Sequence, residues 1–308
     1  MNQSLSLTMY IANWMRTFKK DTVKTATLSR LQCSFNTLQN YAIARMPIGE
    51  ITAYELQEYV NELTSDGYAL STIKKQMFIV AAPLKQAAAM HLIPADPTAG
   101  VRLPKAAKVK KKPRETGAYT TDEQDKLWAV ITQSNNPAVH SIGIMLETGL
   151  RVNEMLALRW EFVSLERKRL YVEGTIINPV GKEKAQYQDS PKSESSRRMI
   201  PLTDRAIELL KRQEGLDDDW VFTGPKGGRL AYQNVLLNIR KACQQANVRY
   251  LGAHAFRHTF ATNCYYRRMD VKLLSRLLGH NDIRVTMNIY VSLRDDGFDE
   301  MYAALNAI

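Results

Sequence analysis

Apolar residues recur at every third or fourth position along the first hundred residues, which is the period of a helix with one buried face. The first predicted helix, 7–18, carries them at Leu7, Tyr10, Ile11, Trp14 and Phe18. The same spacing predicts helices over 24–46, 52–66 and 70–92, and Pro83 is expected to kink the last of them. No strand pattern appears here. Residues 1–103 are therefore predicted to form a small helical bundle.

The periodic pattern stops between Pro104 and Gly117, so residues 104–117 are predicted to be an interdomain linker. A second domain, residues 118–308, opens with the capping-box sequence Thr121-Asp122-Glu123-Gln124. Its predicted helices are 138–147, 152–159, 204–214, 231–246, 254–267 and 270–278, and its predicted strands are 169–177 and 197–202, joined through a polar hairpin turn. The predicted fold class is mainly α (α+β): a small helical bundle, then a mixed, mostly helical domain with a small antiparallel sheet.

The last residues of the chain, 295–308, form a separate tail segment. Apolar residues at i, i+3, i+4 and i+7 predict a short amphipathic helix there. Such a helix can dock onto a neighbouring protomer or pack on its own domain. Its apolar positions are Phe298, Met301, Tyr302 and Leu305.

The formal charge of +11 is unevenly distributed along the chain. Residues 105–117 hold six basic residues and one acidic residue, so this short tract carries nearly half of the excess. A polyanion such as DNA is the expected partner of such a tract. A solvated linker has the same composition. The basic residues are Lys105, Lys108, Lys110, Lys111, Lys112 and Arg114.

The composition also indicates the cellular compartment in which the protein works. No apolar run is long enough to span a bilayer, and the N-terminus lacks the sequence of a signal peptide. The three scattered cysteines, Cys33, Cys243 and Cys264, give neither a disulfide framework nor a metal-ligand pattern. We therefore expect a protein of the reducing cytoplasm with no membrane partner.

The last third of the chain concentrates side chains that can act on a phosphodiester. His254 and Arg257 are three positions apart, so they point the same way from one predicted helix. Gly279-His280 and then Tyr290 follow within 36 residues of His254, and Arg151 adds a second guanidinium upstream. Guanidiniums can hold the phosphate oxygens while a phenol attacks the phosphorus.

Each of these signals is weak when taken alone. Arg151 with Glu154 has the spacing of a helical surface ion pair, which contributes less than about 1 kcal/mol. An isolated His-x-x-Arg is common. It is the fixed order of the whole set along the chain that is specific.

Lys192, a lone lysine after Ser190-Pro191, also belongs to the set, and two positions of the set have rivals nearby. Tyr290 competes with Tyr265-Tyr266, which should lie about three turns along their helix from His254, too far to share its phosphate. Lys192 precedes the second predicted strand in the polar stretch, and Lys182 and Lys184 lie in the same stretch.

Taken together, these residues resemble the tyrosine recombinases, the phage and transposon integrase family. The resemblance covers residues 118–308, and the helical residues 1–103 resemble the family's core-binding (SAM-like) DNA-binding domain. The short sequences around two of these residues, Thr148-Gly149-Leu150-Arg151 and Leu277-Leu278-Gly279-His280, also match. The six matching positions are Arg151, Lys192, His254, Arg257, His280 and Tyr290.

The resemblance implies a role for each position. Tyr290 attacks the scissile phosphate to form a 3′-phosphotyrosine and frees a 5′-hydroxyl, while Arg151 and Arg257 bind the non-bridging oxygens. The covalent ester conserves the bond energy, so neither ATP nor a metal is required. The other implied roles are those of Lys192, which protonates the leaving 5′-oxygen, of His254, which assists proton transfer with Tyr290, and of His280, which hydrogen-bonds the phosphate.

The resemblance also implies partners. These are double-stranded DNA attachment sites, a homotetramer on DNA joined through the tail 295–308, and an accessory DNA-bending or directionality factor. The expected setting is bacterial, phage or mobile-element, with the protein associated with the nucleoid. Many relatives carry an extra N-terminal domain for arm-type sites. Fewer than ten residues precede the first predicted helix here, so that domain is expected to be either unnecessary or removed.

Two other interpretations compete with a site-specific recombinase. A type IB topoisomerase-like enzyme shares the chemistry but acts as a monomer on any duplex, and the amphipathic tail favours the recombinase. A DNA-binding protein without catalysis is the third interpretation. All six matching positions are filled, which argues against it.

Overall fold

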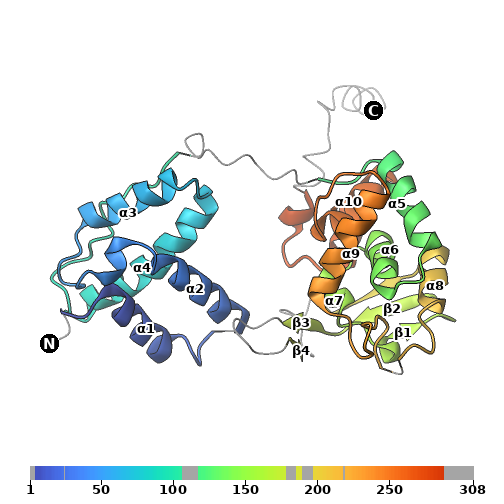
Figure 1. The fold of residues 1–308 in the computed structure, drawn as a ribbon, viewed down its shortest axis with the longest axis horizontal. Helices are drawn as coiled ribbons and strands as arrows, with labels where there is room; N and C mark the ends of the chain where they lie inside the picture. Colours follow the sequence, from blue (N-terminus) through green and yellow to red (C-terminus); the bar gives the residue numbers. More distant parts are fainter. Residues whose placement is uncertain are drawn as a thin grey trace, which may run out of the picture. The chain divides into compact units, whose positions relative to one another are not determined.

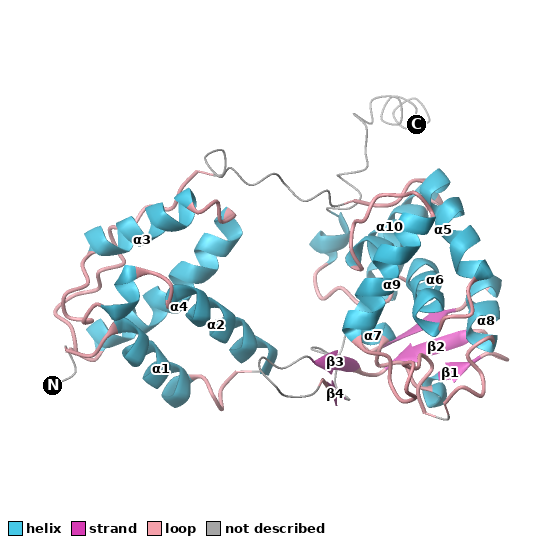
Figure 2. Cartoon of the chain, in the orientation of Figure 1, coloured by secondary structure: helices cyan, strands magenta, loops and turns pink. Residues whose placement is uncertain are grey.

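A computed structural model describes residues 4–23, 25–105, 117–177, 185–188, 197–217 and 219–287. The chain divides into two compact units, one within residues 4–105 and the other largely within residues 117–287 (Figure 1). The first unit is built from helices, whereas the second combines helices and strands (Figure 2). Among the residues described, no helix is long and apolar enough to cross a membrane.

The first unit contains α1 (Leu7–Phe18), α2 (Thr25–Leu38), the 3-10 helix η1 (Ala42–Arg45), α3 (Ala53–Ser65) and α4 (Leu70–Ala89). The single helix predicted over 24–46 is wrong, because α2 ends at Leu38 and the chain turns before η1. Tyr41 explains the turn. Its hydroxyl donates to Asp66 Oδ2 at 2.6 Å, and its ring packs edge-on against Tyr59 with centroids 5.1 Å apart.

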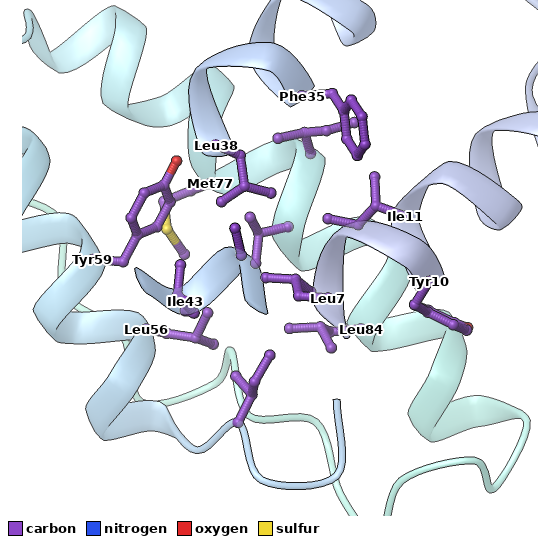
Figure 3. Packing of buried hydrophobic residues seen from close by; sticks show 14 of the residues in the cluster. Leu7, Tyr10, Ile11, Phe35, Leu38, Ile43, Leu56, Tyr59, Met77 and Leu84 are labelled. Atoms are coloured by element: carbon purple, nitrogen blue, oxygen red, sulfur yellow. The ribbon is translucent and has the colours of Figure 1, made fainter. Parts of the chain in front are cut away.

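Apolar side chains from the helices of the first unit meet in one core (Figure 3). The stripe predicted for the first helix is buried there at Leu7, Tyr10, Ile11 and Trp14, whereas Phe18 at the end of the helix is exposed. Pro83 lies inside α4, and the helix continues to Ala89. The remaining labelled core residues of Figure 3 are Tyr10, Phe35, Leu38, Ile43, Leu56, Tyr59, Met77 and Leu84.

The second unit is organised around α6 (Pro137–Thr148), whose side chains are almost all buried. A helix that is apolar on every side must be covered on every side, and α6 packs against α5, α8, α9 and α10. Gly143 allows the close approach of α8, since a Cβ at this position would collide with Leu209 Cδ1. The helices around α6 are α5 (Thr121–Gln133), α8 (Asp204–Lys211), α9 (Tyr232–Gln245) and α10 (His254–Tyr266), and the unit also contains α7 (Val152–Met155), the 3-10 helix η3 (Trp160–Phe162) and α11 (Val271–Leu278).

The strands of the second unit form two small antiparallel sheets. The larger has the order β1 (Val163–Ser164), β2 (Arg169–Val172) and β5 (Arg198–Pro201), and it places buried Leu170 opposite buried Ile200. The smaller pairs β3 (Thr175–Ile177) with β4 (Gln186–Gln188).

The single strand predicted over 169–177 is therefore wrong, as is a simple hairpin turn before residue 197. The chain breaks at Gly174, where a Cβ would lie 2.5 Å from the ring of Tyr187 on β4. The glycine lets this ring pack on the backbone and separates β2 from β3.

The helix predicted over 152–159 is also shorter in the structure, because α7 ends at Met155. The following residues pair with another segment instead. Val221 N donates to Leu158 O at 3.1 Å, and Trp160 N donates to Asp219 O at 3.0 Å. These differences are local, and the predicted fold class is confirmed.

Candidate active site

The turn between α6 and α7 positions Arg151. Gly149 ends α6 in the left-handed region at φ 65°, and a Cβ there would collide with Phe260, so the turn requires glycine. Arg151 is the residue directly before α7, with its backbone N 2.9 Å from Glu154 Oε2 and its Nη1 2.7 Å from Glu154 Oε1. Glu154 is buried. The pair is therefore not the exposed ion pair that its spacing alone suggests.

The first turn of α10 carries His254 and Arg257. The Arg257 guanidinium is buried, and its Nη1 donates to Gly149 O at 2.8 Å. Burial, followed by the charge of Arg151, lowers the pKa of Arg257 to about 9, so the group stays protonated at neutral pH. Desolvation and the charge of Arg257 lower the pKa of His254 below its ordinary value, so its imidazole is largely neutral there.

His280 follows α11, which Gly279 ends in the left-handed region at φ 63°. Its Nδ1 lies 2.8 Å from the hydroxyl oxygen of buried Thr286. Burial, reinforced by Arg257 and other nearby cations, lowers the pKa of His280 to about 4. The imidazole is therefore neutral at physiological pH.

Three successive carbonyls at the end of α11 each accept a hydrogen bond from a different arginine. The last carbonyls of a helix have no partner within the helix and carry partial negative charge, so they attract cations. The end of α11 thus gathers arginines from the α6–α7 turn, from β5 and from α10. The pairs are Arg198 Nε with Leu277 O at 2.6 Å, Arg257 Nη2 with Leu278 O at 2.6 Å, and Arg151 Nη2 with Gly279 O at 3.2 Å.

We call Arg151, Arg198, Arg257 and Glu154 the guanidinium cluster. Burial alone raises the pKa of Glu154, but Arg198 and then Arg151 outweigh it and lower the pKa to about 2. Three guanidiniums thus face one carboxylate, and both nearby imidazoles are neutral. This surplus of positive charge suits an anion with several oxygens, such as a phosphate.

The sequence profile of the phage integrase family matches residues 119–296, which is more than half of the chain. The chain belongs to the phage integrase family. The matched range includes the guanidinium cluster, both histidines and the positions of Lys192 and Tyr290.

Two relatives extend this similarity over nearly the whole chain. The integrase family member described here is 27% identical to a tyrosine recombinase XerC-like protein of Caldanaerobacter subterraneus subsp. tengcongensis, over 94% of this chain and 79% of that one. It is 24% identical to the prophage ps2 probable integrase of Lactococcus lactis subsp. lactis, over 96% of this chain and 82% of that one. The protein is a tyrosine recombinase.

Solved integrase structures share its fold. The Tn1549 transposon integrase in complex with a circular intermediate DNA superposes with a TM-score of 0.81 at 19% identity, over 98% of this chain and all of that one. The lambda integrase tetramer bound to a Holliday junction gives a TM-score of 0.71 at 18% identity, over 91% of this chain and 79% of that one.

Four of the six predicted site residues of this recombinase come together in the structure: Arg151, His254, Arg257 and His280. Lys192 and Tyr290 lie outside the described residues, as do Lys182 and Lys184. The predicted linker contacts Lys108, Lys110, Lys111, Lys112 and Arg114 and the tail 295–308 lie outside them too, whereas Lys105 is described and exposed.

The rival tyrosines occupy the far end of α10. Tyr265 and Tyr266 are eleven and twelve residues from His254, which corresponds to about 17 Å along the helix axis at the usual rise. Tyr266 is largely exposed. Both are too distant along the helix to share a phosphate with His254.

Arg198 is the member of the cluster that the sequence did not reveal. Its side chain is only 5% exposed and lies against Glu154 and the end of α11. These partners are 44 and 79 residues away in the sequence, so no local spacing connects them. The signal that points to Arg198 is a buried carboxylate with two guanidiniums as partners. The sequence does not show this signal, because the burial of Glu154 is visible only in the fold.

Proposed function

We propose that this recombinase cuts and rejoins DNA at specific attachment sites through a 3′-phosphotyrosine intermediate. The observation that carries the proposal is the guanidinium cluster beside two neutral histidines. Arg151 and Arg257 would bind the non-bridging oxygens of the scissile phosphate. An arginine has five N–H donors, and Arg257 spends two on backbone carbonyls, so donors remain for the phosphate.

His280 would supply a further hydrogen bond to the same phosphate. When the Thr286 hydroxyl donates to Nδ1, the ring proton remains on Nε2, which can then donate to a phosphate oxygen. The low pKa of His280 keeps the ring in this neutral form across the physiological range.

The proposed chemistry uses two groups outside the described residues. The phenol oxygen of Tyr290 attacks phosphorus and passes its proton to neutral His254. The P–O bond to the 5′-oxygen breaks, and Lys192 rather than Lys182 or Lys184 gives that oxygen a proton. The 5′-hydroxyl of a second strand then reverses these steps, which restores Tyr290 and joins the strands.

The proposed partners are DNA and further copies of the chain. Residues 1–103 would bind DNA as the core-binding domain, 118–308 would be the catalytic domain, and the basic linker 104–117 would contact phosphates. The Tn1549 transposon integrase binds a circular intermediate DNA, and the lambda integrase forms a tetramer on a Holliday junction. Both support a DNA-bound tetramer here. An accessory DNA-bending or directionality factor would complete the assembly.

A suicide duplex tests the chemistry. It should carry the attachment site, sought in the DNA that flanks the gene, with a nick beside the cleavage position so that the cut end diffuses away. Wild-type protein should become covalently attached to DNA. Tyr290→Phe should bind equally well without attachment. Attachment by Tyr290→Phe would show that another residue is the nucleophile, with Tyr265 and Tyr266 tested next.

Truncation after Ser292 tests the proposed tail. It removes the apolar positions Phe298, Met301, Tyr302 and Leu305 and leaves Tyr290 in place. Single-site binding should persist, while assembly of two sites and full recombination should decline. Wild-type recombination by the truncated protein would mean that the tail packs on its own domain or is dispensable.

A further inference from the structure

The side chain of Arg198 is buried against Glu154 and the end of α11, and hydrogen bonds join it to both. Its Nε donates to Leu277 O at 2.6 Å, its Nη2 to Glu154 Oε2 at 2.8 Å, and its Nη1 reaches Glu154 Oε1 at 3.3 Å. The side chains of both Arg198 and Glu154 are about 5% exposed. Such a buried pair is costly to form and strongly destabilising to break by removing one partner.

Glu154 and the end of α11 in turn each hold a group of the proposed phosphate site. The same two carboxylate oxygens of Glu154 also accept from Arg151, Oε1 from its guanidinium at 2.7 Å and Oε2 from its backbone N–H at 2.9 Å. Leu277 lies three residues before His280, on the turn whose next carbonyl binds Arg257. Arg198 thus lies behind the phosphate-binding groups and contacts the supports of two of them.

The turn at Gly279 fits this arrangement closely. A Cβ at Gly279 would lie 3.0 Å from Arg198 Nη1 and 3.2 Å from its Cδ, tighter than ordinary packing. The positive φ of Gly279 also disfavours other residues. The backbone before His280 is therefore shaped around the Arg198 side chain.

We propose that Arg198 is a positioning residue for strand cleavage, which holds Glu154 and the end of α11 where Arg151 and His280 can reach the scissile phosphate. This role rests on the proposed function. A lysine would keep the charge but not the full set of contacts, since only the planar guanidinium can bind the carboxylate through two nitrogens and a carbonyl through a third.

The neighbouring residue provides a matched control. Arg197 is 57% exposed and pairs with Glu173 at 3.2 Å, away from the cluster. On the suicide duplex, Arg198→Ala should slow covalent attachment about 10²-fold, because a misplacement of about 1 Å at a reacting centre costs that much. Arg197→Ala should remain within about twofold of wild type, as surface substitutions usually do. Equal rates for both variants would overturn the proposal.

A modified substrate distinguishes a defect in phosphate binding from a defect in proton donation by Lys192, whose segment precedes β5. A 5′-phosphorothiolate leaving group needs no proton, so it should restore cleavage to Lys192→Ala and leave Arg198→Ala slow. Rescue of Arg198→Ala would mean that the arginine acts through Lys192, contrary to the proposal.

The pH profile distinguishes positioning of Glu154 from a merely structural contribution. Glu154 faces Arg151 and Arg198, with Arg257 at longer range. Loss of Arg198 raises the pKa of Glu154, so cleavage by Arg198→Ala should fall further on the acidic side. Adding Glu154→Gln should remove that acidic fall. Arg198→Lys should keep the wild-type profile with part of the rate. An unchanged profile in Arg198→Ala would contradict the role.

A crystal structure of Arg198→Ala gives a readout independent of activity. We expect the Arg151 guanidinium and the Gly279–His280 turn to be displaced, and an undisturbed site would overturn the proposal. If neither wild type nor Arg197→Ala forms a covalent complex, the proposed recombination chemistry is wrong. The crystal structure of Arg198→Ala then still decides whether Arg198 positions the site.

Discussion

The two units of this recombinase bury different kinds of side chain. The core of the first unit is apolar, and its one described buried polar side chain, Gln76, accepts from the hydroxyl of Tyr59 at 3.0 Å. The second unit buries Glu154 and Arg257 and holds Arg198 against Glu154. The first core depends on volume and shape, whereas the guanidinium cluster depends on the direction of each hydrogen bond.

This difference determines which substitutions each unit tolerates. Apolar cores accept exchanges that conserve volume, because dispersion and the hydrophobic effect are not directional. A buried charged network does not accept exchanges that conserve charge alone, since each donor must meet its acceptor. The four predictions that follow test this contrast, beginning with the largest expected effect.

Arg257→Lys conserves charge and should still slow strand cleavage by about 10²-fold or more, the usual loss when one donor to a transition-state oxyanion is removed. The lysine cannot bind Gly149 O and Leu278 O together and also reach the phosphate. The measurement is the rate of covalent attachment. Arg267→Lys, at the exposed far end of the same helix, is the matched control and should behave as wild type. Similar rates for both variants would mean that the guanidinium geometry is unimportant.

Leu56→Ala should destabilise the first unit by about 2–5 kcal/mol, because it leaves a cavity in a fully buried site, whereas Leu56→Met should cost less than about 1.5 kcal/mol. The measurement is the free energy of unfolding by urea. Leu103→Ala, at a 40% exposed position, is the control. A cost for Leu56→Met as large as that for Leu56→Ala would remove the contrast between the two units.

His280 should make the stability of the second unit depend on pH. Its pKa is lowered to about 4 in the folded protein, against about 6.5 for an unperturbed histidine, so only the unfolded chain takes up the proton between these values. The stabilisation is therefore complete above about pH 6.5 and is lost as the pH falls toward 4.

His280→Gln removes this titration. The difference in free energy of unfolding between wild type and His280→Gln should be constant above neutral pH. As the pH falls through 6 and 5, wild type should lose more stability than His280→Gln. A difference that does not change with pH would mean that the imidazole is not held neutral in the folded site.

Substitution of Lys110, Lys111 and Lys112 by Gln should have the smallest effect. The linker would contact phosphates without reading sequence, so binding to specific and random duplexes should weaken alike. Each lost phosphate contact should flatten the slope of log affinity against log salt by about 0.9. An unchanged slope would identify the tract as a solvated tether that joins the two units.

The apolar period predicted much of the fold because helix burial is a local property of the sequence. The helices at 7–18, 52–66 and 254–267 were predicted to within a residue or so of α1, α3 and α10. The predictions were wrong where a contact with a residue distant in the sequence determines the local backbone conformation. Tyr41 turned toward Asp66, and Gly174 made room for Tyr187.

The site was predictable where its residues follow one another in a fixed order along the chain. This order led to the prediction of Arg151, His254, Arg257 and His280, which the structure brings together and whose roles stay a prediction. Arg198 was not, because an arginine at the start of a strand is ordinarily exposed, as Arg197 beside it is. Its importance comes from Glu154 and the end of α11, which only folding brings to it.

The most direct test of the account is a crystal structure of Tyr290→Phe bound to an uncleaved duplex that carries the attachment site. We predict that Arg151 and Arg257 donate to non-bridging oxygens of one phosphate at ordinary charge-assisted distances of about 2.7–2.9 Å, with His280 Nε2 as a third donor. A scissile phosphate held by other residues, with the guanidinium cluster bound only to Glu154 and the carbonyls of α11, would contradict the account.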